Sequence, residues 1–306
     1  MADRRGDAAR AAAWRNAARG WLAALQSAGW DGDWYHRAFF DDGSPLGASA
    51  NEECRIDLIA QAWAVISQAA PESFQRTAMA SLDARLVDRE AGLVKLLDPP
   101  LRFAQPSAGY IQAYPPGVRE NGGQYSHAGV WALMAQAQRG DADAAYRYFS
   151  YLSPAHRSRH PGHGAAYAIE PYVMAGDVYT AAPYVGRGGW SWYTGSAAWM
   201  HRAAIESMFG FAQHGNEIAF HPCLPAAWND AEIVLTRGDR KLRILFTRSS
   251  GAPRAEQAAA FTAQALGPGE RIRWSELRSD ACYLIVLDAP HTPAADSAAM
   301  PLVQAG

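Results

Sequence analysis

The sequence is poor in lysine, in net charge and in long apolar runs. Lysine occurs only at positions 95 and 241, and 28 basic residues nearly balance 30 acidic ones, for a formal net charge of −2. A chain without a basic stripe has no electrostatic footprint for nucleic acid or an anionic membrane surface. No segment reaches the ~18 consecutive apolar residues of a membrane span, and residues 1–19 lack the apolar run of a signal peptide. We expect no nucleic-acid partner, no membrane contact from this segment and a cytoplasmic location.

Cysteine is equally scarce. Cys54, Cys223 and Cys282 lie far apart without a Cys-x-x-Cys spacing, so neither a disulfide framework nor a zinc site is indicated. The three thiols are expected to be buried or neutral. We expect no cofactor and no metal site.

The chain is long and rich in alanine and aromatic residues. Its 306 residues are 49% hydrophobic, which suits one large domain or two modest ones. Up to about residue 212, segments with helical spacing of apolar residues alternate with long loops. A set of paired helices of this kind suggests a helical toroid, and the predicted helices cover Asp7–Ala28, Ile56–Ser67, Pro71–Asp88, His127–Arg139, Ala142–Leu152, Pro171–Thr180 and Ser196–Phe211.

The pattern changes beyond Gly215 to short apolar runs bounded by Gly, Asp and Pro, which predict strands. The segment Arg237–Arg240 reads as a hairpin turn. We therefore predict a mainly α part over residues 1–212, a small antiparallel β-sandwich domain over 213–288 and a disordered tail over 289–306. The predicted strands are Glu217–His221, Glu232–Thr236, Leu242–Arg248, Arg271–Trp274 and Cys282–Leu287.

Three long loops, at residues 30–55, 99–126 and 183–194, combine aromatic side chains with Arg, Glu, Asn and Gln. Loops of this length in a compact domain are usually functional or disordered, and these are too aromatic for disorder. Aromatic faces beside charged groups suit a carbohydrate, whose C–H faces stack and whose hydroxyls accept and donate hydrogen bonds. The alternative is that the aromatic side chains only fill the interior of the toroid.

Two helix starts indicate an anion site. Thr194, Gly195 and Ser196 precede a predicted helix, and free N–H groups at a helix N-terminus favour an anion such as phosphate. His127 opens another predicted helix directly after a glycine-rich loop and could donate to the same anion. The alternatives are an ordinary helix cap and a structural histidine.

Several long strings resemble glycoside hydrolase family 94, which holds inverting β-glycoside phosphorylases and the C-terminal region of cyclic β-1,2-glucan synthases. The resemblance covers about residues 8–250 and looks most like the β-1,2-glucan branch. Its strings are the segments 41–47, 51–57, 114–127, 169–172 and 186–197.

The resemblance implies an (α/α)6 barrel, of which this chain holds the C-terminal part, followed by a β-sandwich. It also implies that phosphate attacks the anomeric carbon of a terminal β-glucosyl unit and yields α-glucose 1-phosphate, so inorganic phosphate and a β-gluco-oligosaccharide are the expected partners. The family's phosphate ligands fall on His127, Thr194 and Gly195. Its sugar-contacting positions fall on Tyr114, Arg119 and Glu120, to which side-chain chemistry adds Gln124, Glu170 and Trp190.

One departure concerns the proton donor. The family's general acid is an aspartate in an Asp-Trp-Asn-Asp string, which is expected upstream of Met1. We therefore expect the C-terminal fragment of an inverting β-glucan phosphorylase or of the corresponding region of a cyclic β-1,2-glucan synthase, inactive alone. Its exposed helix faces are expected to make it marginally stable or to lead it to self-associate, for instance as a homodimer. Two alternatives stay open: a non-catalytic carbohydrate-binding half barrel, and an inverting hydrolase. The hydrolase needs a pair of carboxyl groups, for which Glu53, Asp57 and Glu120 are the candidates.

Overall fold

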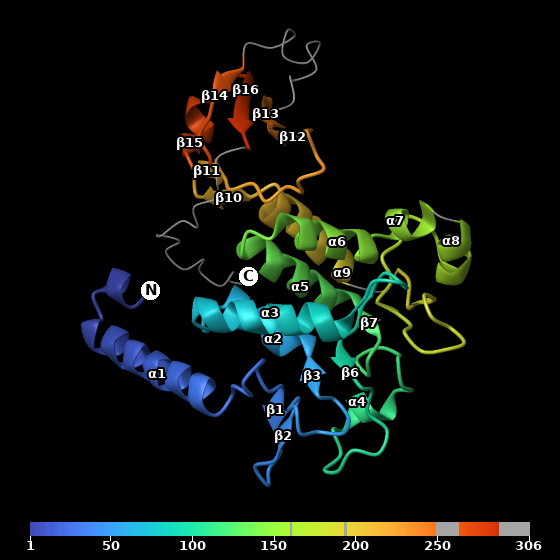
Figure 1. The fold of residues 1–306 in the computed structure, drawn as a ribbon. Helices are drawn as coiled ribbons and strands as arrows, with labels where there is room; N and C mark the ends of the chain where they lie inside the picture. Colours follow the sequence, from blue (N-terminus) through green and yellow to red (C-terminus); the bar gives the residue numbers. More distant parts are fainter. Residues whose placement is uncertain (160, 193–194, 249–262, 288–306) are drawn as a thin grey trace. The chain divides into compact units, whose positions relative to one another are not determined.

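The computed structural model describes residues 1–159, 161–192, 195–248 and 263–287. In this part of the chain 39% of the residues lie in helices and 21% in strands. The chain divides into two compact units. Unit 1 comprises residues 1–138 and 144–204, and unit 2 comprises residues 139–143 and 205–306 (Figure 1).

Two helices of unit 1 begin at an aspartate whose side chain caps the first turn. The Asp7 side chain accepts the Arg10 N–H at the start of α1, and Asp57 accepts the Ile59 N–H at the start of α2. Pro71 directly precedes α3, where its missing N–H costs nothing. The bounds are α1 Ala8–Ser27, α2 Leu58–Ile66, α3 Glu72–Leu86, α4 Tyr110–Ala113, α5 Ser126–Gln138, α6 Ala142–Leu152, α7 Pro154–Arg159, α8 Pro161–Tyr167 and α9 Ser196–Arg202, which continues as a π-helical segment to Met208.

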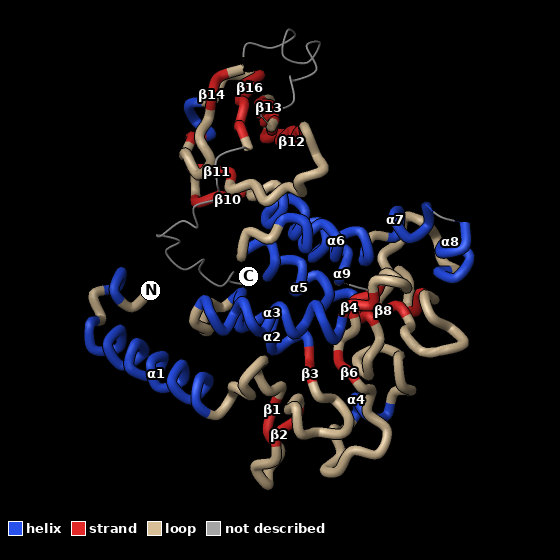
Figure 2. Tube along the Cα trace, viewed as in Figure 1, coloured by secondary structure: helices blue, strands red, loops and turns tan. Residues whose placement is uncertain are grey.

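The core of unit 1 lies between α2, α3 and α5, which pack side by side (Figure 1). Helix α5 is apolar on most sides, and Val130 and Leu133 on it are fully buried. Leu58 on α2 and Leu82 on α3 are also fully buried. The segments around β1, β2 and α4 are mostly loop (Figure 2).

Short strands fasten these loops to the helices. The strands are β1 Ala38–Phe39, β2 Pro45–Leu46, β3 Ile56–Asp57, β4 Val87–Asp88, β5 Leu93–Val94, β6 Leu97–Asp98, β7 Gln124–Tyr125, β8 Asp177–Val178 and β9 Gly188–Gly189. They form two-stranded sheets apart from one antiparallel three-stranded sheet with the order β7-β8-β9. In that sheet Asp177 lies opposite Tyr125 on one side and opposite Gly189 on the other.

The described residues of unit 2 form two sheets. The first has the order β10-β11-β15 and the second the order β12-β13-β16-β14. Phe220 on the first and Phe246 on the second are buried and lie 6.1 Å apart between ring centroids, so the two sheets pack on each other. The bounds are β10 Phe211–His214, β11 Glu217–Phe220, β12 Asp230–Arg237, β13 Arg240–Thr247, β14 Gln264–Ala265, β15 Ile272–Arg273 and β16 Asp280–Val286.

The fold class needs two corrections. The first is that the chain is a mixture of helix and strand rather than mainly α; no barrel is resolved in its described part, for which the sequence predicted only the C-terminal portion of one. The second sheet is not antiparallel throughout, because β13 and β14 both pair parallel to β16. The hairpin at Arg237–Arg240 is confirmed, whereas the predicted tail lies outside the described residues.

The predicted helix Pro171–Thr180 is wrong. Its residues form turns and then strand β8. The backbone hydrogen bonds of Asp177 and Val178 go to β7 and β9 instead of to residues four positions away.

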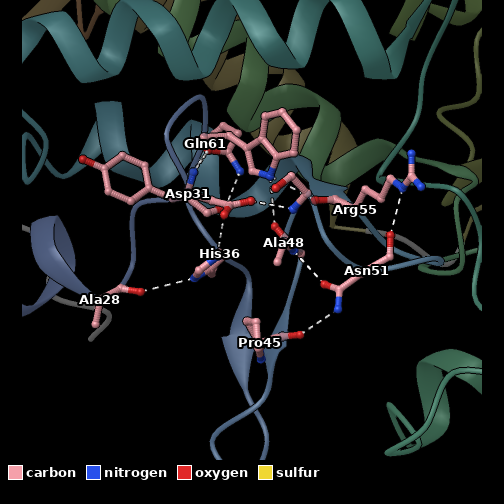
Figure 3. Close-up of polar contacts among 12 residues, drawn as sticks. Ala28, Asp31, His36, Pro45, Ala48, Asn51, Arg55 and Gln61 are labelled. Carbon is pink, nitrogen blue, oxygen red and sulfur yellow. Dashed lines mark hydrogen bonds and ion pairs between the residues drawn. The ribbon is translucent and has the colours of Figure 1, made fainter.

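The loop at residues 30–55 is held by polar side chains of its own and by Gln61 of α2 (Figure 3). Gln61 is fully buried; its Oε1 accepts the Tyr35 N–H at 2.8 Å and its Nε2 donates to the Tyr35 carbonyl at 2.9 Å. Asn51 accepts the Ala48 N–H and donates to the Pro45 carbonyl. This loop, which the sequence marks as a functional candidate, is thus a tightly bonded structural element.

The buried thiols are confirmed. Cys54, Cys223 and Cys282 are all buried and unpaired by disulfides, and burial raises the pKa of each thiol, that of Cys223 to about 12. In the described ranges, no helix has both the length and the apolar character that crossing a membrane requires.

Candidate functional site

The segment 114–125, here called the Arg119 loop, is pinned from inside by Asn121. The Asn121 side chain is fully buried, donates to the carbonyls of Leu101 and Tyr114 at 2.8 Å each, and accepts the Leu101 N–H at 2.7 Å. At Gly117 the backbone has φ 80°, and a Cβ would lie 2.6 Å from that of Ala181, so only glycine fits there. The loop is therefore a rigid support.

Arg119 adopts an unusual backbone conformation in this loop. Its φ is 52°, in the left-handed region, which costs a side-chain-bearing residue roughly 1–2 kcal/mol. The Arg119 N–H donates to Asp177 Oδ2 at 2.7 Å across 58 residues of sequence. Asp177 is fully buried on the central strand β8. The contact that holds this conformation is therefore a charge-assisted hydrogen bond.

The Arg119 guanidinium lies between two aromatic rings. Its Cζ is 4.6 Å from the ring centroid of Trp190 and 5.7 Å from that of Tyr114. Its Nε lies 3.9 Å from Glu120 Oε2. Trp190 directly follows strand β9, so the β7-β8-β9 sheet brings the two glycine-rich loops together. We call Tyr114, Arg119, Glu120 and Trp190 the Arg119 cluster.

Two polar atoms of this cluster, one on Arg119 and one on Glu120, are shielded from solvent but not hydrogen-bonded to each other. Arg119 Nε and Glu120 Oε2 are buried and have no hydrogen-bond partner within the described ranges, and 3.9 Å is too long for a hydrogen bond between them. The side chains themselves are 22% and 17% exposed. A hydroxyl group can bond to both at once, as donor to the carboxylate and acceptor from the guanidinium.

The carboxylates around the cluster are electrostatically coupled. Burial raises the pKa of Asp177, and the charge of Glu120 raises it further against the opposing Arg119 N–H and charge. Burial, followed by the charge of Glu120, also raises the pKa of Tyr125. The Tyr125 hydroxyl thus stays protonated and uncharged at neutral pH, near the Glu120 carboxylate.

His127 lies in a second group of aromatic rings. It is the second residue of α5, and its ring centroid lies 4.5 Å from that of Trp131 and 5.4 Å from that of Trp199 in the first turn of α9. Burial lowers the pKa of His127, so the imidazole is neutral at pH 7. His127 Nε2 and Trp131 Nε1 are both buried without a hydrogen-bond partner among the described residues. Two polar nitrogens on adjacent turns of α5 therefore have no partner within the described part of the chain.

Of the other two predicted phosphate ligands, Gly195 is the exposed residue that precedes α9, and Thr194 lies outside the described residues. Because Trp199 is in the first turn of α9, its contact with His127 brings that histidine beside the start of the helix. The convergence of His127 and Thr194 on one anion stays a prediction.

Gln124 and Glu170 do not join the Arg119 cluster. Gln124 is fully buried, and its Oε1 accepts the Val94 N–H at 2.9 Å, so it ties β7 to β5. Glu170 Oε1 accepts the Trp192 indole N–H at 3.2 Å, and Trp192 makes an edge contact with Tyr172. Glu170 therefore belongs to an exposed aromatic group next to the Trp190 turn.

The hydrolase candidates Glu53 and Asp57 both have structural partners. Glu53 accepts backbone N–H groups from Arg102, Phe103 and Ala104, which together hold its pKa below the usual range despite the opposing effect of burial. Asp57 caps α2 and lies 3.3 Å from Arg37. Only Glu120 of the three faces the cluster.

Sequence reasoning missed Asp177, because that residue falls in the wrongly predicted helix 171–180. The signal was present: an acidic residue inside the otherwise apolar and glycine-containing run 173–179 must find a partner when that run is buried. In the portion of the chain that the structure describes, no group of three His, Cys, Asp or Glu side chains is arranged to hold a metal ion.

An arginine beside two aromatic rings, with a carboxylate next to it on a rigid loop, is a side-chain combination that suits carbohydrate recognition. The comparison with known proteins agrees with this class. Residues 1–210 match the catalytic domain of the glycosyl hydrolase 94 superfamily, and the chain belongs to that family.

Its relatives include several named enzymes. The chain is 41% identical over 251 residues to the cyclic beta-(1,2)-glucan synthase NdvB of Rhizobium meliloti, an alignment that covers 81% of this chain and 9% of that protein. It is 32% identical over 224 residues to solabiose phosphorylase of Paenibacillus borealis, covering 72% and 28%. It is 25% identical over 270 residues to N,N'-diacetylchitobiose phosphorylase of Vibrio furnissii, covering 87% and 33%. The chain thus spans a third or less of the length of each of these relatives.

Proposed function

We propose that this chain supplies the sugar- and phosphate-binding part of an inverting β-glucan phosphorylase or of the corresponding region of a cyclic β-1,2-glucan synthase. The observation that carries the proposal is the β7-β8-β9 sheet, which sets Arg119 and Glu120 beside Trp190 in a member of family 94. The identity to the glucan synthase NdvB favours a β-1,2-linked glucan as the substrate.

In this reaction a phosphate oxygen attacks the anomeric carbon and forms the C1–O bond of α-glucose 1-phosphate, while the glycosidic C1–O bond breaks. Phosphate is already an anionic nucleophile, so no carboxylate is needed to activate it, in contrast to hydrolysis. The leaving oxygen takes a proton from a general acid, a role that we assign to no residue of this chain. The residues here bind and orient the two substrates.

Within the proposal, Trp190 and Tyr114 contact the C–H face of the terminal glucosyl unit, and Arg119 and Glu120 bond its hydroxyls. His127, with Thr194 and Gly195, holds the phosphate. A neutral imidazole suits this task, because it can donate one N–H to the phosphate at pH 7.

The sugar site is tested by isothermal titration of the 306-residue chain with β-1,2-linked glucotriose. We expect Arg119→Ala and Trp190→Ala each to weaken binding at least tenfold, which corresponds to about 1.4 kcal/mol. Arg187, which is exposed and precedes strand β9 as Trp190 follows it, provides the matched control: Arg187→Ala should stay within threefold. Unchanged affinity in Arg119→Ala and Trp190→Ala would remove the sugar site from this cluster.

The phosphate site is tested separately with inorganic phosphate. We expect His127→Ala to weaken phosphate binding at least tenfold while glucotriose binding changes less than threefold. The reason is that, of the two substrates, the imidazole is proposed to contact only the phosphate. His201→Ala, an exposed histidine on α9, is the control. Equal losses of sugar and phosphate affinity in His127→Ala would contradict the separation of the two subsites.

A further inference from the structure

We propose that Asp177 is a positioning residue of the sugar site: its buried carboxyl group holds the Arg119 N–H and thereby fixes the direction of the Arg119 side chain. The inference rests on the proposed function for the role of Arg119, but the contact itself is a property of the fold. Asp177 lies on the central strand of the β7-β8-β9 sheet, between the two loops that supply the Arg119 cluster.

The pairing register explains why the Asp177 side chain can lie there. Residues directly opposite one another in antiparallel strands place their side chains on the same face, and Asp177 is opposite Gly189. A Cβ on Gly189 would lie 2.8 Å from Asp177 Oδ1 and 2.8 Å from Tyr179 Cε1. Glycine at 189 therefore leaves the room that the Asp177 carboxyl group occupies.

The Arg119 backbone needs a contact of this kind. Its φ of 52° is unfavourable for a residue with a side chain, so a specific partner must hold it. The hydrogen bond from the Arg119 N–H to Asp177 Oδ2, at 2.7 Å, is that partner. With the backbone fixed, the guanidinium is directed to the Trp190 ring and to Glu120.

Among the described residues, the Asp177 side chain makes one hydrogen bond, the one from the Arg119 N–H. Asp177 Oδ1 is buried without a hydrogen-bond partner among the described residues, and Asp177 forms no hydrogen bond with the guanidinium of Arg119 within those ranges. Burial also raises the pKa of Asp177, so the site tolerates an uncharged side chain better than an ordinary aspartate site does. An asparagine, which keeps one acceptor oxygen, should therefore replace Asp177 functionally.

Thr180 offers a matched control. Its Oγ1 donates to the Gly122 carbonyl at 2.7 Å, so it ties the same loop to the same segment without touching the Arg119 N–H. Thr180→Val removes that bond at nearly constant volume. A general loosening of the Arg119 loop should appear in Thr180→Val as well as in Asp177→Ala, whereas a specific effect on Arg119 should appear only in Asp177→Ala.

The experiment measures amide hydrogen exchange of Arg119 by NMR and β-1,2-glucotriose binding by isothermal titration, on the whole chain. We expect Asp177→Ala to speed Arg119 exchange and to weaken sugar binding at least tenfold each, with the exchange of α5 amides unchanged. Asp177→Asn and Thr180→Val should both stay within threefold of the wild type. If Asp177→Ala does not fold, Gly189→Ala takes its place, since its Cβ displaces the carboxyl group and should speed Arg119 exchange to the same degree.

Three results would overturn the proposal: Arg119 exchange that is unchanged in the variant that folds, Asp177→Asn that is as impaired as Asp177→Ala, or Thr180→Val that causes the same losses. The sugar site and the Asp177–Arg119 contact can fail independently. If the wild-type chain binds no glucotriose while Arg119 exchange responds as expected, the sugar site is wrong and the positioning contact stands.

Discussion

At the scale of single residues, the neighbouring acids Glu53 and Asp57 show how local partners decide a carboxylate's behaviour. Glu53 faces three backbone N–H groups, which lower its pKa. Asp57 is fully enclosed, and burial raises its pKa to about 6 although Arg37 and the Ile59 N–H oppose that shift. Both are structural, so acidic residues in a conspicuous motif need not be catalytic.

Asp57 makes a testable contribution to pH dependence. Because its folded pKa lies above the ordinary value of 3.8, the folded state binds more protons between about pH 4 and 6, and stability falls as the pH rises through that window. The shift corresponds to at most about 3 kcal/mol. Asparagine also caps helices well. We expect the difference in unfolding free energy, wild type minus Asp57→Asn, to fall from pH 4 to pH 6 in urea titrations.

The control for this prediction is Asp57→Ala, which removes the cap of α2 and should be less stable than Asp57→Asn by about 1 kcal/mol at every pH. A wild-type-minus-Asn difference that does not change between pH 4 and 6 would show that Asp57 keeps an ordinary pKa in the folded protein.

At the scale of elements, local sequence patterns predicted the elements whose hydrogen bonds are local. The helices at residues 8–27 and 142–152 and the hairpin at 237–240 follow from their spacing, caps and turn residues. The two-residue strands do not, because their partners lie far away in the sequence. The segment 171–180 is the clearest case: its pattern allowed a helix, and pairing with β7 and β9 decided otherwise.

The residues of the candidate site were likewise predicted only in part. The resemblance to family 94 and side-chain chemistry pointed to Arg119, Glu120 and Trp190, which the fold does bring together. Nothing local distinguished Gln124, which turned out to serve the core, from those residues. Tertiary packing decides which side chains are buried. The sequence therefore predicts the kinds of side chain at a site better than it predicts which individual residues line the site.

Glu53 allows an element-scale prediction, because one side chain holds the turn at residues 102–104. We expect Glu53→Ala to speed amide exchange at Phe103 and Ala104 at least tenfold and to cost about 1–2 kcal/mol of stability, as three N–H groups lose a charged acceptor. The exposed neighbour Glu52 provides the control through Glu52→Ala, which should change neither quantity measurably. Slow exchange at these amides in Glu53→Ala would mean that other contacts hold the turn.

At the scale of the whole molecule, two units with separate cores share one chain, and most helix lies in unit 1. A network on α3 and α6 stabilises that unit: Asp83 accepts hydrogen bonds from Tyr148 at 2.9 Å and from Arg147 at 2.8 Å. Burial opposes ionisation of Asp83, but these bonds outweigh it and hold its pKa below the ordinary value of 3.8. The carboxylate form is therefore the one that the folded state favours.

Acid should weaken unit 1 through this network. A group with a lowered folded pKa contributes stability that is present above about pH 4 and is lost as the pH falls through the folded pKa. We expect the urea midpoint of the wild type, followed by the helical circular-dichroism signal, to fall steeply below pH 4. Asp83→Asn should be less stable by about 1–3 kcal/mol at pH 7 but flatter in acid. Parallel pH profiles for the two proteins would exclude Asp83 as a source of acid sensitivity.

The three-stranded β7-β8-β9 sheet also has a consequence for the order of folding. Its strands come from distant segments, and the Arg119–Asp177 contact alone closes 58 residues of chain. Loop closure over such a span costs entropy before any contact repays it, and high contact order slows assembly. The backbone hydrogen bonds of helix α5 join residues one turn apart, so we expect helical structure to form early in refolding. We expect the sugar binding proposed above to return only after the long-range closure between β7, β8 and β9 is complete.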